Sequence, residues 1–225
     1  MAKARKKTQK PADRTPDEWR HDILDAVMVH VPFDGWSRKS LAEALKDLNL
    51  DPGIARLAFP DGIREIVEAY LKRVDRQMMA ALEGIDPESL SIRQRIASAV
   101  KTRLELHQDQ RPLVERTVAY LALPFNADLS LCSLWRTSDL IWRWAGDTAT
   151  DYNHYSKRAI LSAVYSSTLL YWLNDESVAA ADTWGFLDRR IENVMQFEKL
   201  KARLRKAAEK MPNLARELGR LRYGE

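Results

Sequence analysis

Cysteine and glycine are both scarce in this chain of 225 residues, and each scarcity excludes a class of architecture. The single cysteine, Cys132, has no second thiol to pair with, which excludes a disulfide framework within the chain. Because Leu129, Leu131 and Leu134 surround it, we expect Cys132 to be buried as a small apolar side chain. Eight glycines are few for an open β architecture with many tight turns, so the composition favours helices.

Long apolar runs and catalytic motifs are missing as well. A membrane-spanning helix needs about 18 consecutive apolar residues, and the sequence contains no such stretch. The N-terminus also lacks the apolar segment of a secretory signal. The four histidines are scattered, and Glu105 and His107 are two apart rather than the three of a di-iron Glu-x-x-His pair. The sequence contains neither a glycine-rich phosphate loop nor a nucleophile elbow. We therefore predict a soluble, non-catalytic protein with no metal and no cofactor.

Positive charge is concentrated at the two ends of the chain. Residues 1–14 carry six Lys or Arg against one Asp, and residues 197–222 carry nine against three Glu. Since the formal net charge is only +4, the part between is net acidic. Basic ends on such a body favour an anionic partner, either phospholipid or nucleic acid. We interpret residues 1–14 as a disordered basic arm of a cytoplasmic protein, with the stub of a mitochondrial transit segment as the alternative.

Apolar residues recur at helical spacing throughout the rest of the chain, which predicts an all-α fold. Thr15, Pro16 and Glu18 form a capping box with proline in the first turn, and Pro32 should end that helix. Ser37 and Asp182 are expected to cap two others. The expected helices cover about 16–32, 38–48, 54–59, 63–82, 87–108, 111–123, 126–145, 152–173 and 182 onward.

Residues 15–80 have the helix order of a TetR-type DNA-binding head, but not its charge. Between Asp34 and Gly62 four Lys or Arg stand against five Asp or Glu, and Arg56 is the only donor side chain on the third helix. DNA binding needs cations for the phosphates and donors for the bases. We therefore read a degenerate helix-turn-helix head with no nucleic-acid partner. A TetR-type transcriptional regulator with a hydrophobic ligand pocket remains the alternative.

The tail, residues 197–225, is basic and amphipathic up to Pro212, which should kink it. A helix of this kind suits an anionic membrane surface, with its large apolar residues inserted and its cations at the headgroups. Packing of the apolar face on the protein's own body, or a short dimeric coiled coil, is the competing interpretation. The expected membrane-contact residues are Phe197, Leu200, Lys201, Leu204, Arg205 and Met211.

The body, residues 81–196, contains an aromatic and serine-rich stripe that begins polar and becomes apolar. Small residues interrupt the bulky ones, so the stripe is able to line a tunnel with a polar mouth, where Arg158 would hold a phosphate. The competing interpretation is an ordinary core or dimer interface, with Arg158 paired to Asp147 or Asp151. The candidate lipid-binding residues are Tyr155, Arg158, Ser162, Tyr165 and Leu169, together with Trp135 and Trp142.

Three segments, 33–37, 146–159 and 182–191, resemble the Coq-nine family of ubiquinone biosynthesis proteins. They read Phe-Asp-Gly-Trp-Ser, Gly-Asp-Thr-Ala-Thr-Asp-Tyr-Asn-His-Tyr-Ser-Lys-Arg-Ala and Asp-Thr-Trp-Gly-Phe-Leu-Asp-Arg-Arg-Ile. The resemblance covers about residues 17–199. It implies a TetR-like fold that has lost DNA binding, a pocket for an isoprenoid or phospholipid, and a C-terminal helix that docks on membranes.

The resemblance also implies partners and residue roles. It implies a homodimer built on about residues 151–173 and 182–196, and a di-iron hydroxylase that receives an isoprenoid quinone precursor. The headgroup-contacting arginine falls on Arg158, and the partner-facing patch falls on Asp151, Asn153, His154 and Tyr155. His154 stands where the family often has Trp. The implied location is peripheral, on the cytoplasmic face of the inner membrane, or in the mitochondrial matrix of a eukaryote.

Overall fold

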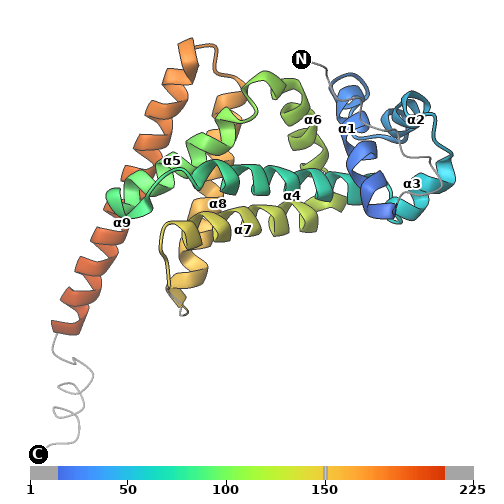
Figure 1. The fold of residues 1–225 in the computed structure, drawn as a ribbon. Coiled ribbons are helices and arrows are strands. Elements are labelled where there is room, and N and C mark those ends of the chain that lie inside the picture. Colours follow the sequence, from blue (N-terminus) through green and yellow to red (C-terminus); the bar gives the residue numbers. More distant parts are fainter. Residues whose placement is uncertain (1–14, 149, 151, 211–225) are drawn as a thin grey trace, which may run out of the picture. The chain divides into compact units, whose positions relative to one another are not determined.

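The computed structural model describes residues 15–148, 150 and 152–210, and its chain divides into two compact units. One unit extends to Asn174 and the other begins at Asp175. All regular secondary structure in the described part of the chain is helical (Figure 1), which confirms the predicted all-α fold.

The first three helices form the head of the first unit. They are α1 (Pro16–Asp34), α2 (Arg38–Asp47) and α3 (Pro52–Ala58), and they lie around the N-terminal end of α4 (Ile63–Leu82), as Figure 1 shows. The capping box at Thr15 is formed as predicted. The apolar face of α1 packs in one core with side chains of α4, which fixes the head on that helix.

The first helix ends two residues later than predicted. Pro32 lies inside the last turn of α1, and the chain turns instead at Gly35, whose φ of +67° strains any residue with a Cβ. The turn directs Trp36 into the core, where its indole Nε1 donates to Thr117 Oγ1 at 2.9 Å. The structure therefore gives the Gly-Trp pair of segment 33–37 a role in packing the head against the body.

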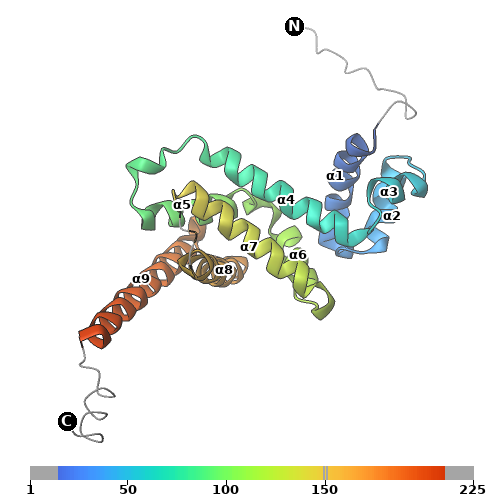
Figure 2. The same ribbon diagram turned by 90° about the horizontal axis from the view of Figure 1, so that it is seen from below.

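The rest of the first unit surrounds α4 with four further helices. Figures 1 and 2 show α4 and α7 side by side, with α8 packed on α7. The helix predicted over 87–108 is divided, because Ser91 caps a new helix after the short 3-10 turn Pro87–Ser89. These helices are α5 (Ile92–Glu105), α6 (Arg111–Leu121), α7 (Ala127–Trp144) and α8 (Tyr152–Leu173).

The expectation of a buried Cys132 is wrong. The thiol is exposed, and the neighbouring Leu131 is 67% exposed. The buried side of α7 passes through Leu129, Ser133 and Ile141 instead. The three neighbouring leucines therefore wrongly predict burial of the thiol, because Leu131 faces solvent as Cys132 does.

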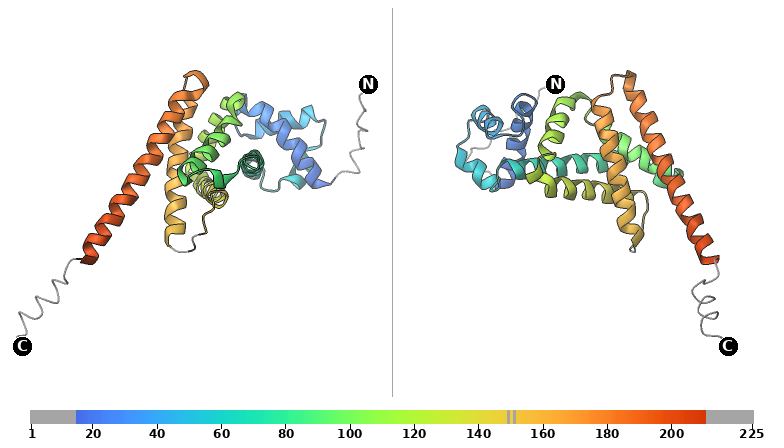
Figure 3. Two further views of the ribbon diagram at one scale, coloured as in Figure 1. Left: turned by 60° about the vertical axis from the view of Figure 1, so that its left-hand side comes forward. Right: turned by 180° about the vertical axis from the view of Figure 1, so that it is seen from behind.

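The second unit is dominated by the long helix α9 (Ala181–Lys210), drawn from two further directions in Figure 3. Asp175, rather than the predicted Asp182, caps this region: its Oδ2 accepts from the backbone N of Thr183 at 2.9 Å and from its hydroxyl. Burial opposes ionisation of Asp175, but hydrogen bonds from Ser177 and Thr183 outweigh it and lower the pKa of the carboxyl. As predicted, the helix continues unbroken past residue 195 into the basic tail.

No single helix within the described ranges is long and apolar enough to cross a bilayer. The segments Gln108–Leu121 and Pro124–Trp144 reach the required length and apolarity only together, and the chain bends by 96° between them.

Candidate functional site

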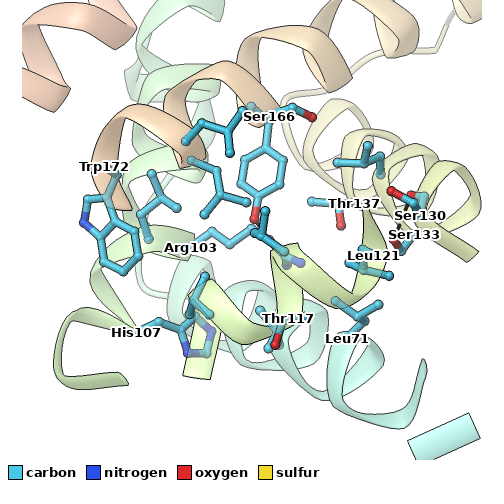
Figure 4. A pocket seen from close by; sticks show the side chains of 18 of the residues that line it. Leu71, Arg103, His107, Thr117, Leu121, Ser130, Ser133, Thr137, Ser166 and Trp172 are labelled. Carbon is cyan, nitrogen blue, oxygen red and sulfur yellow. Dashed lines mark hydrogen bonds between the residues drawn. The ribbon is translucent and has the colours of Figure 1, made fainter. Parts of the chain in front are cut away.

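A cavity of about 210 Å³ lies in the first unit, lined mostly by residues of α4, α5, α6, α7 and α8 and partly open to the surface (Figure 4). Leucines, valines and aromatic rings form most of its wall. The lining residues are Tyr70, Leu71, Val74, Arg103, Leu104, His107, Val114, Thr117, Val118, Leu121, Ala122, Ser130, Ser133, Leu134, Thr137, Tyr165, Ser166, Leu169, Leu170 and Trp172. Leu170 is 52% exposed and Ala122 is exposed, so the wall reaches the surface there, whereas Trp172 is fully buried.

The size and lining of the cavity indicate what it can hold. Its volume of about 210 Å³ exceeds the roughly 150 Å³ of an apolar protein cavity that binds benzene. It is below the roughly 300–1,000 Å³ of pockets that take a whole drug-sized ligand. The cavity therefore fits an apolar segment or one ring of a larger molecule.

One wall of the cavity rests on a buried charge network. The guanidinium of Arg103 donates from Nη1 to Asp75 Oδ1 at 2.6 Å and from Nε to the Tyr165 hydroxyl at 3.0 Å. Asp75 also accepts from Arg136 Nε at 2.7 Å and from the Thr137 hydroxyl at 2.8 Å. Paired and hydrogen-bonded in this way, the buried charges tie α4, α5, α7 and α8 together.

His107 follows α5 and is the second polar feature of the wall. Its side chain is buried, and its ring lies 6.3 Å from the Tyr70 ring, measured between centroids. Burial and the charge of Arg103 both lower the pKa of this imidazole. His107 is therefore neutral at pH 7.

The seven predicted lipid-binding residues are spread over five different places in the structure. Tyr165 and Leu169 line the cavity. Ser162 lies between α8 and α7, where its hydroxyl is 2.9 Å from that of Ser138. Trp142 packs near the start of α8, and its Nε1 donates to the Lys157 carbonyl at 3.0 Å. Lipid contact by these residues stays a prediction.

Arg158 is buried in an ion-pair network and is not among the residues that line the cavity. Its Nε donates to Asp139 at 2.6 Å, and its Nη1 donates to Asp147 at 3.1 Å and to the His154 carbonyl at 3.0 Å. Lys157 reaches Asp147 as well, at 2.5 Å. The network joins α7 to α8 and gives Asp147, Lys157 and Arg158 of segment 146–159 a structural role.

Trp135, His154 and Tyr155 form an aromatic cluster where α7 meets the start of α8. Their ring centroids are 5.1 to 6.4 Å apart, and Tyr155 is 61% exposed. The cluster contains two of the four residues predicted to face a partner. Asn153 is exposed beside it, and Asp151 lies outside the described residues.

The predicted membrane-contact residues are only partly described. The helix α9 includes the positions of Phe197, Leu200, Lys201, Leu204 and Arg205. Their side chains lie outside what the structure describes. Met211 lies beyond the last described residue. Their contact with a membrane stays a prediction from the sequence.

Two lysines of the head are held in ion pairs with carboxylates. Lys39 Nζ is 2.7 Å from Asp34, and Lys46 Nζ is 2.7 Å from Glu43. A phosphate backbone would have to compete with these pairs for the cations. On α3, Arg56 is exposed and Leu57 beside it is 75% exposed, which gives this helix an apolar tip. That the head binds no nucleic acid stays a prediction.

The sequence did not indicate the contributions of α4, α5 and α6 to the cavity. Arg103 and His107 had no motif around them, and their neighbours on the wall come from helices distant in the chain. The available signal was an arginine and a histidine on the apolar sides of predicted helices. Across the described residues, no group of three or more His, Cys, Asp or Glu is arranged to hold a metal ion.

The described part of the chain is all-helical, with a three-helix head on a long fourth helix, and it has a TetR-like fold. The solved TetR transcriptional regulator from Nitrosomonas europaea ATCC 19718 shares it, with a TM-score of 0.64 and 20% identity. The match covers 78% of this chain and 97% of that one. At this identity the likeness shows the fold alone, and the predicted TetR-like architecture is confirmed.

Sequence comparison then gives the particular relatives. Residues 127–198 match the family model of COQ9. The chain is 32% identical to the human "Ubiquinone biosynthesis protein COQ9, mitochondrial", over 80% of this chain and 58% of that protein. The rat protein is 33% identical, over 80% of this chain and 59% of that protein. The Drosophila melanogaster protein is 28% identical, over 81% of this chain and 57% of that protein. The chain thus spans about three-fifths of the length of these curated relatives. The resemblance read from its motifs is confirmed: the chain is a relative of the COQ9 proteins.

Proposed function

We propose that this chain is a non-catalytic, lipid-binding accessory protein of ubiquinone biosynthesis. It holds an isoprenoid quinone precursor or a phospholipid and presents it to a di-iron hydroxylase of the same pathway. The observation that carries the proposal is the apolar cavity within α4 to α8 of a chain related to COQ9 proteins. The pathway is inferred from the names of the relatives, and the apolar character of the ligand is inferred from the lining of the cavity.

The cavity argues for partial rather than complete enclosure of the lipid. A volume of about 210 Å³ accommodates one end of an amphipathic molecule, and apolar burial stabilises it by about 25 cal/mol per Å² removed from water. The remainder of a long isoprenoid would stay in the membrane or in a partner's groove. This arrangement suits a protein that lifts a lipid part of the way and passes it on.

Contact with the membrane is assigned to the tail that begins at residue 197. The protein then acts as a peripheral membrane protein, on the cytoplasmic face of the inner membrane or on the matrix side in a mitochondrion. The human relative's name includes the word mitochondrial, which is consistent with the second location. The surface we assign to the hydroxylase is the aromatic cluster of Trp135, His154 and Tyr155, in which Tyr155 is exposed and the other two rings are half-buried. The homodimer implied by the family resemblance is part of the same proposal.

Filling the cavity is expected to remove bound lipid. Ser133 is buried on the cavity wall, so Ser133→Phe places a ring in the space that the lipid needs, at a stability cost of about 1–3 kcal/mol. We expect the isoprenoid lipid extracted per mole of purified protein, quantified by mass spectrometry, to fall at least about fivefold. A fivefold fall corresponds to a loss of about 1 kcal/mol of binding free energy.

The matched control is Cys132→Phe, which adds the same ring one residue earlier on the exposed side of α7. This variant should carry as much lipid as the unmodified protein. Equal lipid content in both phenylalanine variants, with both folded by circular dichroism, would contradict binding in the cavity.

Neutralising two cations of the tail is expected to weaken membrane binding. Each Lys or Arg near an anionic surface contributes about 1 kcal/mol, so Lys201→Gln with Arg205→Gln should weaken binding to phosphatidylserine-containing vesicles by about 30-fold. Vesicle flotation at several salt concentrations measures the change.

The control pair, Lys46→Gln with Lys101→Gln, removes the same charge from exposed positions of the first unit. Its vesicle binding should match that of the unmodified chain. If both pairs weaken binding equally, net charge rather than the tail explains membrane contact.

A further inference from the structure

His107 combines burial with unused hydrogen-bonding capacity at the wall of the cavity. It is 7% exposed, and neither Nδ1 nor Nε2 has a hydrogen-bond partner. The Gln110 side chain lies near enough to affect the ring's ionisation but forms no hydrogen bond of acceptable geometry with it. Within the described ranges, no other residue lining the cavity has a buried side-chain nitrogen or oxygen without a partner.

The surrounding polar groups are already engaged. Trp172 Nε1 donates to Gln108 Oε1 at 3.2 Å, and Arg103 donates to Asp75 and to Tyr165. In the view of Figure 4, His107 and Trp172 lie on one side of the cavity, opposite Ser130 and Ser133. The unused nitrogens are therefore at one identifiable end of a largely apolar space.

A buried polar group without a partner is costly, and such groups in native proteins call for an explanation. A ligand that supplies the missing hydrogen bond removes the cost when it binds. A neutral imidazole offers one N–H donor and one acceptor nitrogen. Burial and Arg103 keep the His107 ring neutral by lowering its pKa, so it favours an uncharged hydroxyl or carbonyl oxygen over an anion.

We propose that His107 is the specificity-determining contact of this cavity, and that it hydrogen-bonds an uncharged hydroxyl or carbonyl oxygen on the ring of the bound molecule. The cavity thus accepts the oxygen-bearing ring end of a neutral lipid, and its apolar tail extends toward the exposed rim at Ala122 and Leu170. This inference rests on the proposed function and adds the orientation and the head chemistry of the ligand.

Two small probes that differ by one hydroxyl test the proposal. p-Cresol and toluene have nearly the same shape, and a cavity without a hydrogen-bond partner would favour toluene, because the phenol loses its bonds to water. Calorimetric titration of the full, lipid-free chain gives a dissociation constant for each probe. We expect His107→Leu to reduce the preference for p-cresol over toluene by about tenfold, and His107→Gln, which keeps a donor and an acceptor, to retain most of it.

The outcomes separate this inference from the function on which it rests. Toluene binding that persists in His107→Leu shows that the cavity is intact, and a preference that is the same with and without His107 then overturns the inference alone. Failure of the unmodified chain to bind either probe overturns the cavity proposal, and the role of His107 with it.

Discussion

Replacing Asp75 by asparagine is expected to lower the free energy of unfolding by about 3–5 kcal/mol, because it leaves the buried cation of Arg103 and the partly buried one of Arg136 without their counter-charge. Asp75 is 3% exposed and is the carboxylate shared by Arg103 and Arg136. The amide keeps the shape but not the charge. Chemical denaturation of both proteins under the same conditions measures the difference.

The matched control for this change is Asp128→Asn. Asp128 also pairs with an arginine, Arg64, at 2.5 Å, but its side chain is 70% exposed. Exposed pairs contribute about 0–1 kcal/mol, so this variant should unfold close to the unmodified protein. Similar losses in the two variants would show that the Asp75 network is not the electrostatic support of the cavity wall.

The second large effect is expected at Arg158. Replacing it by methionine removes the cation that Asp139 and Asp147 share, and the side chain of Asp147 is only 4% exposed. Breaking a buried pair in this way should cost about 3 kcal/mol, with Lys157 limiting the loss because it also reaches Asp147. Thermal unfolding followed by circular dichroism measures the loss.

Arg143→Met is the control, because Arg143 pairs with the same Asp139 from a side chain that is 70% exposed. It should cost less than about 1 kcal/mol. A stability loss at Arg158 no greater than at Arg143 would contradict the structural role. The amount of lipid bound per folded molecule of Arg158→Met tests, separately, the headgroup role implied by the family resemblance.

Local features of the fold were predictable because local chemistry determines them. The capping box at Thr15 and the apolar spacing of 63–82 lie within single helices, and both were confirmed. The stop at Pro32 was wrong, because Gly35, rather than the missing N–H of proline, sets the turn that inserts Trp36. The sequence shows that a helix must end near these residues, and the packing of Trp36 decides where.

The cavity was predictable only in part. Tyr165 and Leu169 were identified because they follow one stripe of a single helix. Arg103 and His107 belong to α5 and the turn after it, and their place on the wall depends on how α4, α6 and α8 pack around them. Arg158 shows the opposite problem. Its position on the stripe suggested a cavity mouth, whereas its charged partners are the two carboxylates of Asp139 and Asp147.

The proposal that this COQ9 relative holds one end of a lipid inside its body is tested most directly by crystallography. The protein would be purified without detergent from cells that make ubiquinone. We predict continuous elongated electron density between Leu169 and Trp172 on α8 and the facing side chains of α4, with its polar end within hydrogen-bonding distance of His107. A cavity filled by rearranged side chains or by water, in protein whose extract contains isoprenoid lipid, would contradict the account.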